Sequence, residues 1–200
     1  CYALAFALTS KLKIIVDSYG LQDLVSKTIR GIGDAEERFR EDYTRILRAI
    51  RFACQLGFSI EQKTQRALTE LASNLNDKNK QDDFIAPREV IAKEFLKSFK
   101  YNPVKALDLY DKLNIFNTLA PELIAMQGCP QPEIYHSEGD VWQHTRMALQ
   151  NISSRAFKKF NKKLDKILPA NSRTELIIAL LLHDIGKPAT LQTPKKDGTD

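Results

Sequence analysis

Five arginines and five carboxylates alternate with apolar residues in Gly33–Phe58, "GDAEERFREDYTRILRAIRFACQLGF". A guanidinium group holds a phosphate or a base edge through two parallel hydrogen bonds, which the lysine ammonium does not do. A carboxylate three residues from an arginine adds an acceptor beside this fork of donors, and pairing with the edge of a nucleobase needs both. The segment therefore has the side chains to bind a nucleotide. The alternative is a solvated face laced by weak ion pairs.

All three histidines lie in two other stretches, "YHSEGDVWQHTRMAL" (135–149) and "LIIALLLHDIGKPAT" (176–190). His183 and Asp184 end an apolar helical run, and His144 lies on a helix of its own. Neutral imidazole and carboxylate together are a common ligand set for a divalent cation. The sequence therefore predicts a metal site at His144, His183 and Asp184. The alternative is a capped helix end with one hydrogen-bonded histidine.

The spacing of apolar residues predicts a mainly α-helical protein that positions both groups. Two β-prone runs, "YALAFAL" and "LKIIVD", predict a hairpin or sheet edge within residues 2–16. Every later element is expected to be a helix, because apolar residues recur three and four apart between prolines. The polar stretch 73–83 predicts a linker or long loop. The predicted helices cover residues 35–56, 61–75, 88–99, 103–113, 139–152 and 173–184.

One helix over residues 35–56 would separate core from charge. At about 100° per residue, Arg45, Arg48 and Arg51 descend one side, and Arg38 lies beside Asp42. The opposite arc, about 120° wide, holds Phe39, Tyr43, Ile46, Leu47, Ile50, Ala53 and Cys54.

The composition is that of a globular protein, with 43% hydrophobic and 28% charged residues among 200. The net charge of +5 permits a nucleic-acid partner without requiring one. Three widely spaced cysteines argue against a disulfide framework or a structural zinc site. No apolar run reaches the roughly 18 residues of a membrane span, so we expect no membrane contact and a cytoplasmic location. The start at Cys1 and the open end indicate a segment of a longer protein.

The stretch "ERFREDYTRILRAIRFACQLGFSIE" closely resembles the neck of the class II tRNA nucleotidyltransferases, which are the CCA-adding enzymes, and of the bacterial poly(A) polymerases. "LKIIVDSYGLQDLVSKTIRGIGD" resembles the end of their catalytic head, and "NPVKALDLYDKLNIFNTLAPELIAMQGCPQP" resembles their body domain. The resemblance implies a short β remnant of the head, a helical neck and body, and an incomplete α-helical HD domain. The implied bounds are 1–33 for the head remnant, 34–75 for the neck, 76–130 for the body and 131–200 for the partial HD domain.

The resemblance also implies roles for single residues. Asp42 and Arg45 match the Glu-Asp-x-x-Arg pair that bonds the base of incoming CTP or ATP, so that protein rather than a template chooses the nucleotide. Arg48 and Arg51 match arginines expected near the triphosphate or holding the neck against the head. No catalytic residue is expected in this segment. The family's head carries a Gly-Ser followed by an Asp-x-Asp pair whose carboxylates hold Mg²⁺, and both motifs are absent here. Two further departures are the single glycine of "DSYGLQDL" and Tyr2 in place of an asparagine.

His144, His183 and Asp184 match the first three ligands of the HD phosphohydrolases, whose pattern is His, then His-Asp, then a distant Asp. The fourth has no counterpart here, because Asp197 and Asp200 follow too closely. His136 is expected to assist the site or to cap a helix. The basic run 154–168 would follow an RNA backbone, or it is a solvated helix.

The function that the resemblance implies is template-independent addition of CCA to tRNA 3′ ends from CTP and ATP. Mg²⁺ is then expected mainly in the head, and a second divalent metal at the HD site. One alternative is a poly(A) polymerase. Another is an HD-type metal-dependent phosphohydrolase with an RNA-binding helical module, and a third is a non-catalytic RNA-binding module.

Overall fold

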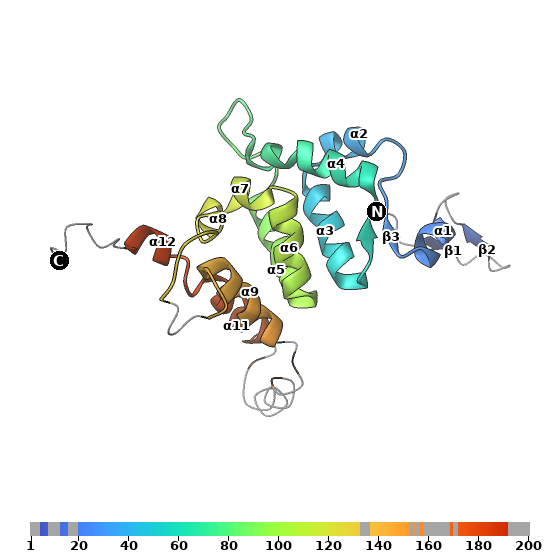
Figure 1. The fold of residues 1–200 in the computed structure, drawn as a ribbon. Coiled ribbons are helices and arrows are strands. Elements are labelled where there is room, and N and C mark those ends of the chain that lie inside the picture. The colour runs from blue at the N-terminus through green and yellow to red at the C-terminus, as the bar shows by residue number, and fades with distance from the viewer. Residues whose placement is uncertain are drawn as a thin grey trace. The chain divides into compact units, whose positions relative to one another are not determined.

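The computed structural model describes residues 5–7, 13–15, 20–132, 137–152, 154, 157, 169 and 172–191, and within them the protein is mainly helical, as predicted (Figure 1). The chain divides into two compact units, Cys1–Leu119 and Ala120–Asp200. Several features singled out in the sequence lie outside the described residues: Tyr2, Asp17, His136, most of the basic run 154–168, Asp197 and Asp200.

The first unit starts with the predicted hairpin, which is confirmed. Strands β1 (Ala5–Ala7) and β2 (Lys13–Ile15) pair antiparallel, and a short helix α1 (Gly20–Val25) follows. The prediction that all later elements are helices was wrong at one place. Strand β3 (Thr28–Ile29) pairs in parallel with β4 (Ser59–Ile60). Two-residue strands are too short for the alternation of apolar and polar residues that identifies a strand in a sequence.

The single helix predicted over residues 35–56 is in fact two helices, α2 (Ala35–Glu41) and α3 (Thr44–Leu56). Asp42 interrupts them with an extended backbone, φ −158° and ψ 100°. Its Oδ1 accepts hydrogen bonds from the backbone N of Thr44 at 2.9 Å and from the Thr44 hydroxyl at 2.6 Å. Aspartate competes for backbone donors in this way at helix starts, which explains a break without glycine or proline.

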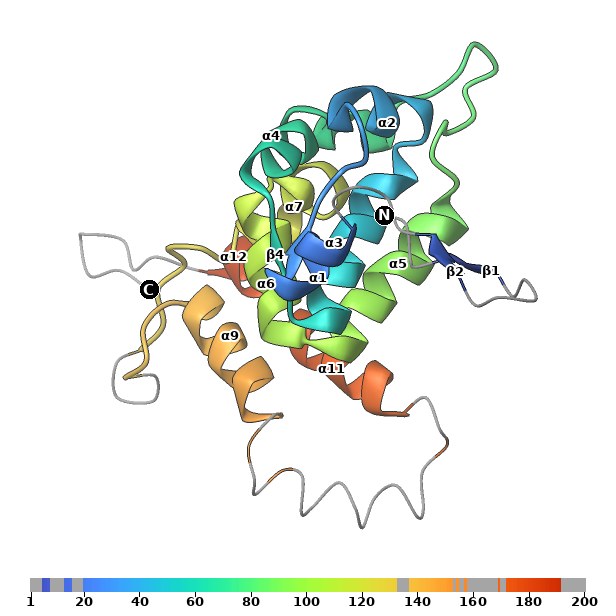
Figure 2. The ribbon, with the colours of Figure 1, turned by 90° about the vertical axis from the view of Figure 1, so that its right-hand side faces the viewer.

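Helix α3 supplies the centre of the first core. Ile46, Leu47, Ile50 and Ala53 have no exposed surface. They face α5 (Arg88–Tyr101) and α6 (Pro103–Lys112), and α3 and α5 lie side by side in both views (Figures 1 and 2). Gly57 ends α3 in the left-handed conformation, with φ +71°. An aromatic cluster with ring centroids 4.7–5.8 Å apart continues this core along α5, α6 and α7 (Ile115–Leu119). Its members are Phe95, Phe99, Tyr110 and Phe116.

Helix α4 (Gln62–Glu70) packs against α2 and runs into a 3₁₀ helix, η1 (Ala72–Asn76). The predicted loop over residues 73–83 therefore begins later than expected. Residues 77–87 connect η1 to α5 without a regular element, apart from one antiparallel bridge between Lys78 and Phe84.

The second unit contains α8 (Pro121–Ile124), α9 (Val141–Asn151), α11 (Ser172–Leu182) and α12 (Lys187–Thr190). Helices α9 and α11 pack together, and they confirm the helices predicted over 139–152 and 173–184 to within two residues at most ends. Their buried apolar residues are Val141, Leu149, Ile177 and Leu181. Among the described helices of the chain, no helix has both the length and the apolar character to cross a bilayer.

Candidate functional sites: an arginine pocket and a metal centre

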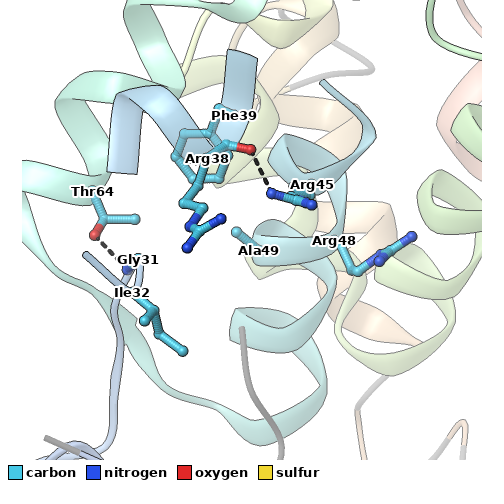
Figure 3. Close-up of a pocket in the computed structure, with 8 residues that line it drawn as sticks. All are labelled: Gly31, Ile32, Arg38, Phe39, Arg45, Arg48, Ala49 and Thr64. Carbon is cyan, nitrogen blue, oxygen red and sulfur yellow. Dashed lines mark hydrogen bonds between the residues drawn. The ribbon is translucent and has the colours of Figure 1, made fainter. Parts of the chain in front are cut away.

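A pocket of about 200 Å³ lies in the first unit between the segment after β3 and helices α2, α3 and α4 (Figure 3). Three of its lining side chains are arginines. Figure 3 shows Arg38 reaching from α2 into the space between Ile32 and α3, which contributes Arg45 and Arg48. The lining residues are Gly31, Ile32, Arg38, Phe39, Arg45, Arg48, Ala49 and Thr64.

One carboxylate, that of Glu41, accepts hydrogen bonds from two of these arginines. Glu41 accepts hydrogen bonds from Arg45 at 2.6 Å and from Arg38 at 2.9 Å. These two bonds lower the pKa of the Glu41 carboxyl group. The bond from Arg45 has the larger effect, and the bond from Arg38 has the next largest. Arg45 also donates to the backbone oxygen of Arg38 at 2.9 Å, which ties the start of α3 to α2. The ionised Glu41 therefore fixes the spacing of the two guanidinium groups.

Arg48 adds a positive charge that is not neutralised within the described residues. Its side chain is exposed, and among those residues it forms neither an ion pair nor a hydrogen bond. The pocket wall thus carries more positive than negative charge, which favours an anionic ligand.

Asp42 does not line the pocket but lies next to it. Its Oδ1 is engaged by Thr44, whereas its Oδ2 lies 3.9 Å from Arg45 Nε, beyond hydrogen-bond distance. The predicted pair Asp42 and Arg45 are therefore neighbours that present an acceptor oxygen and a set of donors side by side.

Arg51 lies elsewhere. Its Nε is 2.5 Å from Glu94 Oε2 on α5, and the two side chains are only 12% and 8% exposed. It also donates to Gln55 at 2.8 Å, and its guanidinium group lies 3.9 Å from the centre of the Phe52 ring. Of the four predicted nucleotide-binding residues, two line the pocket, one borders it, and Arg51 joins α3 to α5.

The far wall of the pocket was not predicted from the sequence. The backbone N of Gly31 donates to the Thr64 hydroxyl at 2.9 Å, and this hydroxyl donates to Glu61 at 2.7 Å. Arg30 bonds both Glu61 and Asp23. A Cβ on Gly31 would lie 2.7 Å from the Cβ of Ala35 at the start of α2, so glycine is needed for this close approach. Two of these contacts, Gly31 with Thr64 and Arg30 with Glu61, join residues more than thirty positions apart, which local sequence patterns do not reveal.

In the second unit the structure brings the three predicted metal ligands together. One ligand atom from each of His144, His183 and Asp184 lies within 4.8 Å of the others. Asp184 Oδ2 is 3.2 Å from His183 Nε2 and 3.9 Å from His144 Nε2. The two imidazole rings have centroids 5.3 Å apart. His144 comes from α9, and the other two follow the end of α11.

The donor set fits a divalent cation. Asp184 Oδ2 is buried and makes no hydrogen bond of good geometry with a described residue, although the Lys187 ammonium lies 2.8 Å away. A buried carboxylate oxygen between two imidazole nitrogens is a typical environment for a transition-metal ion. Lys187 also donates to Gln131 at 2.7 Å. The sequence indicated neither Lys187 nor Gln131 as part of this site.

Comparisons with known proteins find similar sequences over most of the chain. It is 32% identical over 179 residues to the "Multifunctional CCA protein" of Neisseria gonorrhoeae. The matched region covers 88% of this chain and 38% of that protein. It is 34% identical over 157 residues to the "CCA-adding enzyme" of Streptococcus thermophilus, covering 78% of this chain and 39% of that enzyme. The chain thus spans well under half the length of these relatives. No family model matches it.

Among solved structures, a chain described as "tRNA-processing enzyme (apo form I)" is 22% identical, with a TM-score of 0.47, and covers 86% of this chain and 48% of that one. Another, described as "Structure of tRNA-processing enzyme with CTP", is 18% identical with a TM-score of 0.43. The match covers 90% of this chain and 62% of that one.

Proposed function

The chain belongs to the family of the CCA-adding enzymes, and from this premise we propose that it is the nucleotide-selecting and helical part of an enzyme that adds CCA to tRNA 3′ ends. Its substrates are CTP and ATP, and its macromolecular partner is tRNA. The observation that carries the proposal is the arginine pocket, which Arg45 lines and Asp42 borders. The division into a head remnant (1–33), neck (34–75), body (76–130) and partial HD domain (131–200) belongs to the same proposal.

The geometry supports base selection in the following way. Cytosine and adenine both present an amino donor beside a ring-nitrogen acceptor, whereas guanine and uracil present a carbonyl acceptor beside an N–H donor. Asp42 Oδ2 supplies an acceptor and Arg45 supplies donors, which complements the first pattern and leaves groups unpaired with the second. An unpaired buried polar group is costly, so such a site rejects the wrong base strongly. Arg38 and Arg48 are then left for the phosphates.

Asp42 allows a test that separates base selection from helix capping. Asp42→Asn keeps an oxygen that accepts from Thr44, but it replaces the second oxygen with an amide donor. We expect this variant to retain the helix content of the wild type and to lose at least tenfold of its preference for CTP and ATP over GTP and UTP. Asp42→Ala should lose both the cap and the selectivity.

Two measurements test this. Calorimetry gives the affinity of the chain for each of the four nucleotides, and nucleotide addition is then assayed in a chimaera in which the chain replaces its counterpart in the Streptococcus thermophilus enzyme. Arg40→Ala is the matched control, because Arg40 is an exposed arginine of α2 that pairs with Glu36 and does not line the pocket. An Asp42→Asn protein with wild-type selectivity overturns the assignment. A chimaera that adds only A favours the poly(A) polymerase alternative.

Nucleotidyl transfer requires Mg²⁺, which activates the attacking hydroxyl and stabilises charge at the α-phosphate. The sequence has no Asp-x-Asp pair, so no residue of this chain is assigned to that metal. The pocket residues bind and orient the nucleotide only.

A second candidate function rests on the cluster of His144, His183 and Asp184. These residues would hold a divalent cation that activates water for hydrolysis of a phosphate ester. The test is hydrolysis of a 2′,3′-cyclic nucleotide to the ring-opened nucleoside monophosphate in the presence of Mn²⁺, Co²⁺ or Ni²⁺. This activity should be lost in His183→Ala. Absence of metal-dependent hydrolysis by the wild-type protein would rule this candidate out.

A further inference from the structure

Glu138 contacts one of the candidate metal ligands without belonging to the cluster. Its Oε1 lies 2.5 Å from His144 Nδ1, and its side chain is only 16% exposed. The local chain holds it there. Gly139 has φ +118°, which favours glycine, and Asp140 then caps α9 through a 2.8 Å bond from Gln143 N. His144 follows one turn later, so this tight turn brings Glu138 alongside the first turn of the helix.

The second histidine of the cluster is held in the same way. His183 Nδ1 lies 2.8 Å from the backbone oxygen of Leu180. A carbonyl oxygen only accepts, so in the neutral imidazole Nδ1 carries the proton and His183 Nε2 keeps its lone pair. A carboxylate imposes the same tautomer on His144. Both Nε2 atoms lie within 4 Å of the buried Asp184 Oδ2.

We propose that Glu138 is a positioning residue for this metal site: it fixes His144 in the tautomer protonated at Nδ1, so that Nε2 is available as a ligand. The inference rests on the metal site proposed above. It adds Glu138, which contacts the candidate ligand His144 and is not itself one of the candidate ligands. Such carboxylate–histidine pairs orient the ring and increase its basicity, and their loss typically costs about 10- to 100-fold in metal affinity.

Two variants separate the effects of Glu138. Glu138→Gln keeps an acceptor oxygen for the Nδ1 proton and removes only the charge. Glu138→Ala removes both. We expect Co²⁺ affinity to fall about 10- to 100-fold in the alanine variant and by less in the glutamine variant. Glu175→Ala is the matched control, because Glu175 is an exposed carboxylate of α11 in the same unit. It should bind Co²⁺ as the wild type does.

The decisive readout is the tautomer of His144, measured by long-range ¹H–¹⁵N NMR on the metal-free protein. The proton should reside on Nδ1 in the wild type and in Glu138→Gln, and should move largely to Nε2 in Glu138→Ala. A merely structural role of Glu138 would not produce this shift. If Glu138→Ala keeps the Nδ1 tautomer and the Co²⁺ affinity of the control, the role of Glu138 is overturned while the metal site stands. If the wild type binds no Co²⁺, the metal site itself is overturned.

Discussion

Arg48 and Arg51 lie about one turn apart on α3, yet their surroundings differ completely. Arg48 is exposed at the pocket, whereas Arg51 is largely covered and pairs with the buried Glu94. The two arginines therefore contribute to different properties. Arg48 adds to the positive charge of the pocket, and Arg51 adds to the stability of the first unit.

The first prediction concerns this buried pair. Arg51→Ala should lower the free energy of unfolding by about 3–5 kcal/mol, because it leaves the Glu94 carboxylate buried without its partner. Arg48→Ala should change it by less than about 0.5 kcal/mol. Urea unfolding followed by circular dichroism measures both. The double variant Arg51→Met with Glu94→Leu should recover most of the loss, and equal costs for the two single arginine variants would contradict the assignment.

A second prediction concerns pH and Cys54. Burial raises the pKa of the Cys54 thiol from about 9.0 to about 12. Above pH 9 the unfolded chain releases this proton while the folded protein keeps it, so the stabilising contribution is complete below pH 9 and is lost toward pH 12. At pH 10.5 the loss relative to pH 8 amounts to about 2 kcal/mol.

Cys54→Ala should lose less stability than the wild type over this interval, whatever its stability at pH 8. Urea titrations at pH 8 and pH 10.5 give the comparison. Parallel losses in the two proteins would show that Cys54 does not carry this dependence.

Sequence reasoning at the residue scale identified side chains by type better than by environment. The ligand cluster was predicted because His144, His183 and Asp184 are chemically distinctive and lie near helix ends. The family resemblance led to the expectation that Arg51 lies near the triphosphate or between neck and head. Its contact with Glu94 was not predicted, because the two residues are 43 positions apart. Glu138 was not singled out because a turn at Gly139 brings it to His144, and no helical spacing predicts that contact.

At the scale of elements, the junction between β3 and α2 determines the shape of the arginine pocket. Gly31 permits the closest approach, and Thr64 on α4 bonds its backbone N. Helix periodicity predicted α3 through α6 well, since each has a continuous apolar face. It did not predict the break at Asp42, because the interruption comes from a side-chain hydrogen bond and the apolar spacing continues across it.

A third prediction tests this junction. Gly31→Ala should destabilise the first unit by about 1–3 kcal/mol, because its new Cβ meets Ala35 Cβ at 2.7 Å and Ala35 Cα at 3.1 Å. Adding Ala35→Gly removes the nearer of these atoms and should restore part of the loss. Thermal unfolding of the two variants checks this, and a Gly31→Ala protein as stable as the wild type would be inconsistent with the close approach.

At the scale of the whole molecule, each of the two compact units has its own core and its own candidate site. A ligand that binds the native state of one unit stabilises the structure that forms its site. The two sites should therefore respond to different ligands.

The fourth prediction follows from this division. In hydrogen–deuterium exchange followed by mass spectrometry, CTP should slow exchange in peptides from α2 and α3, and Co²⁺ should slow it in peptides from α9 and α11. Each ligand should leave the peptides of the other unit unchanged. Protection of α9 and α11 by CTP would show that the units are energetically coupled.

The pairing of β3 with β4 has a consequence for how this protein can be recombined. Bonds from Ser59 N to Lys27 O and from Glu61 N to Ile29 O, at 2.9 and 3.0 Å, bring the two ends of the intervening segment together. Helices α2 and α3, which carry most of the pocket, therefore lie in one segment, residues 30–58, whose two ends are adjacent in the fold. Under the proposed function, exchanging this segment with that of a relative at these two neighbouring junctions, with the contacts of α3 to α5 kept, should transfer the nucleotide preference.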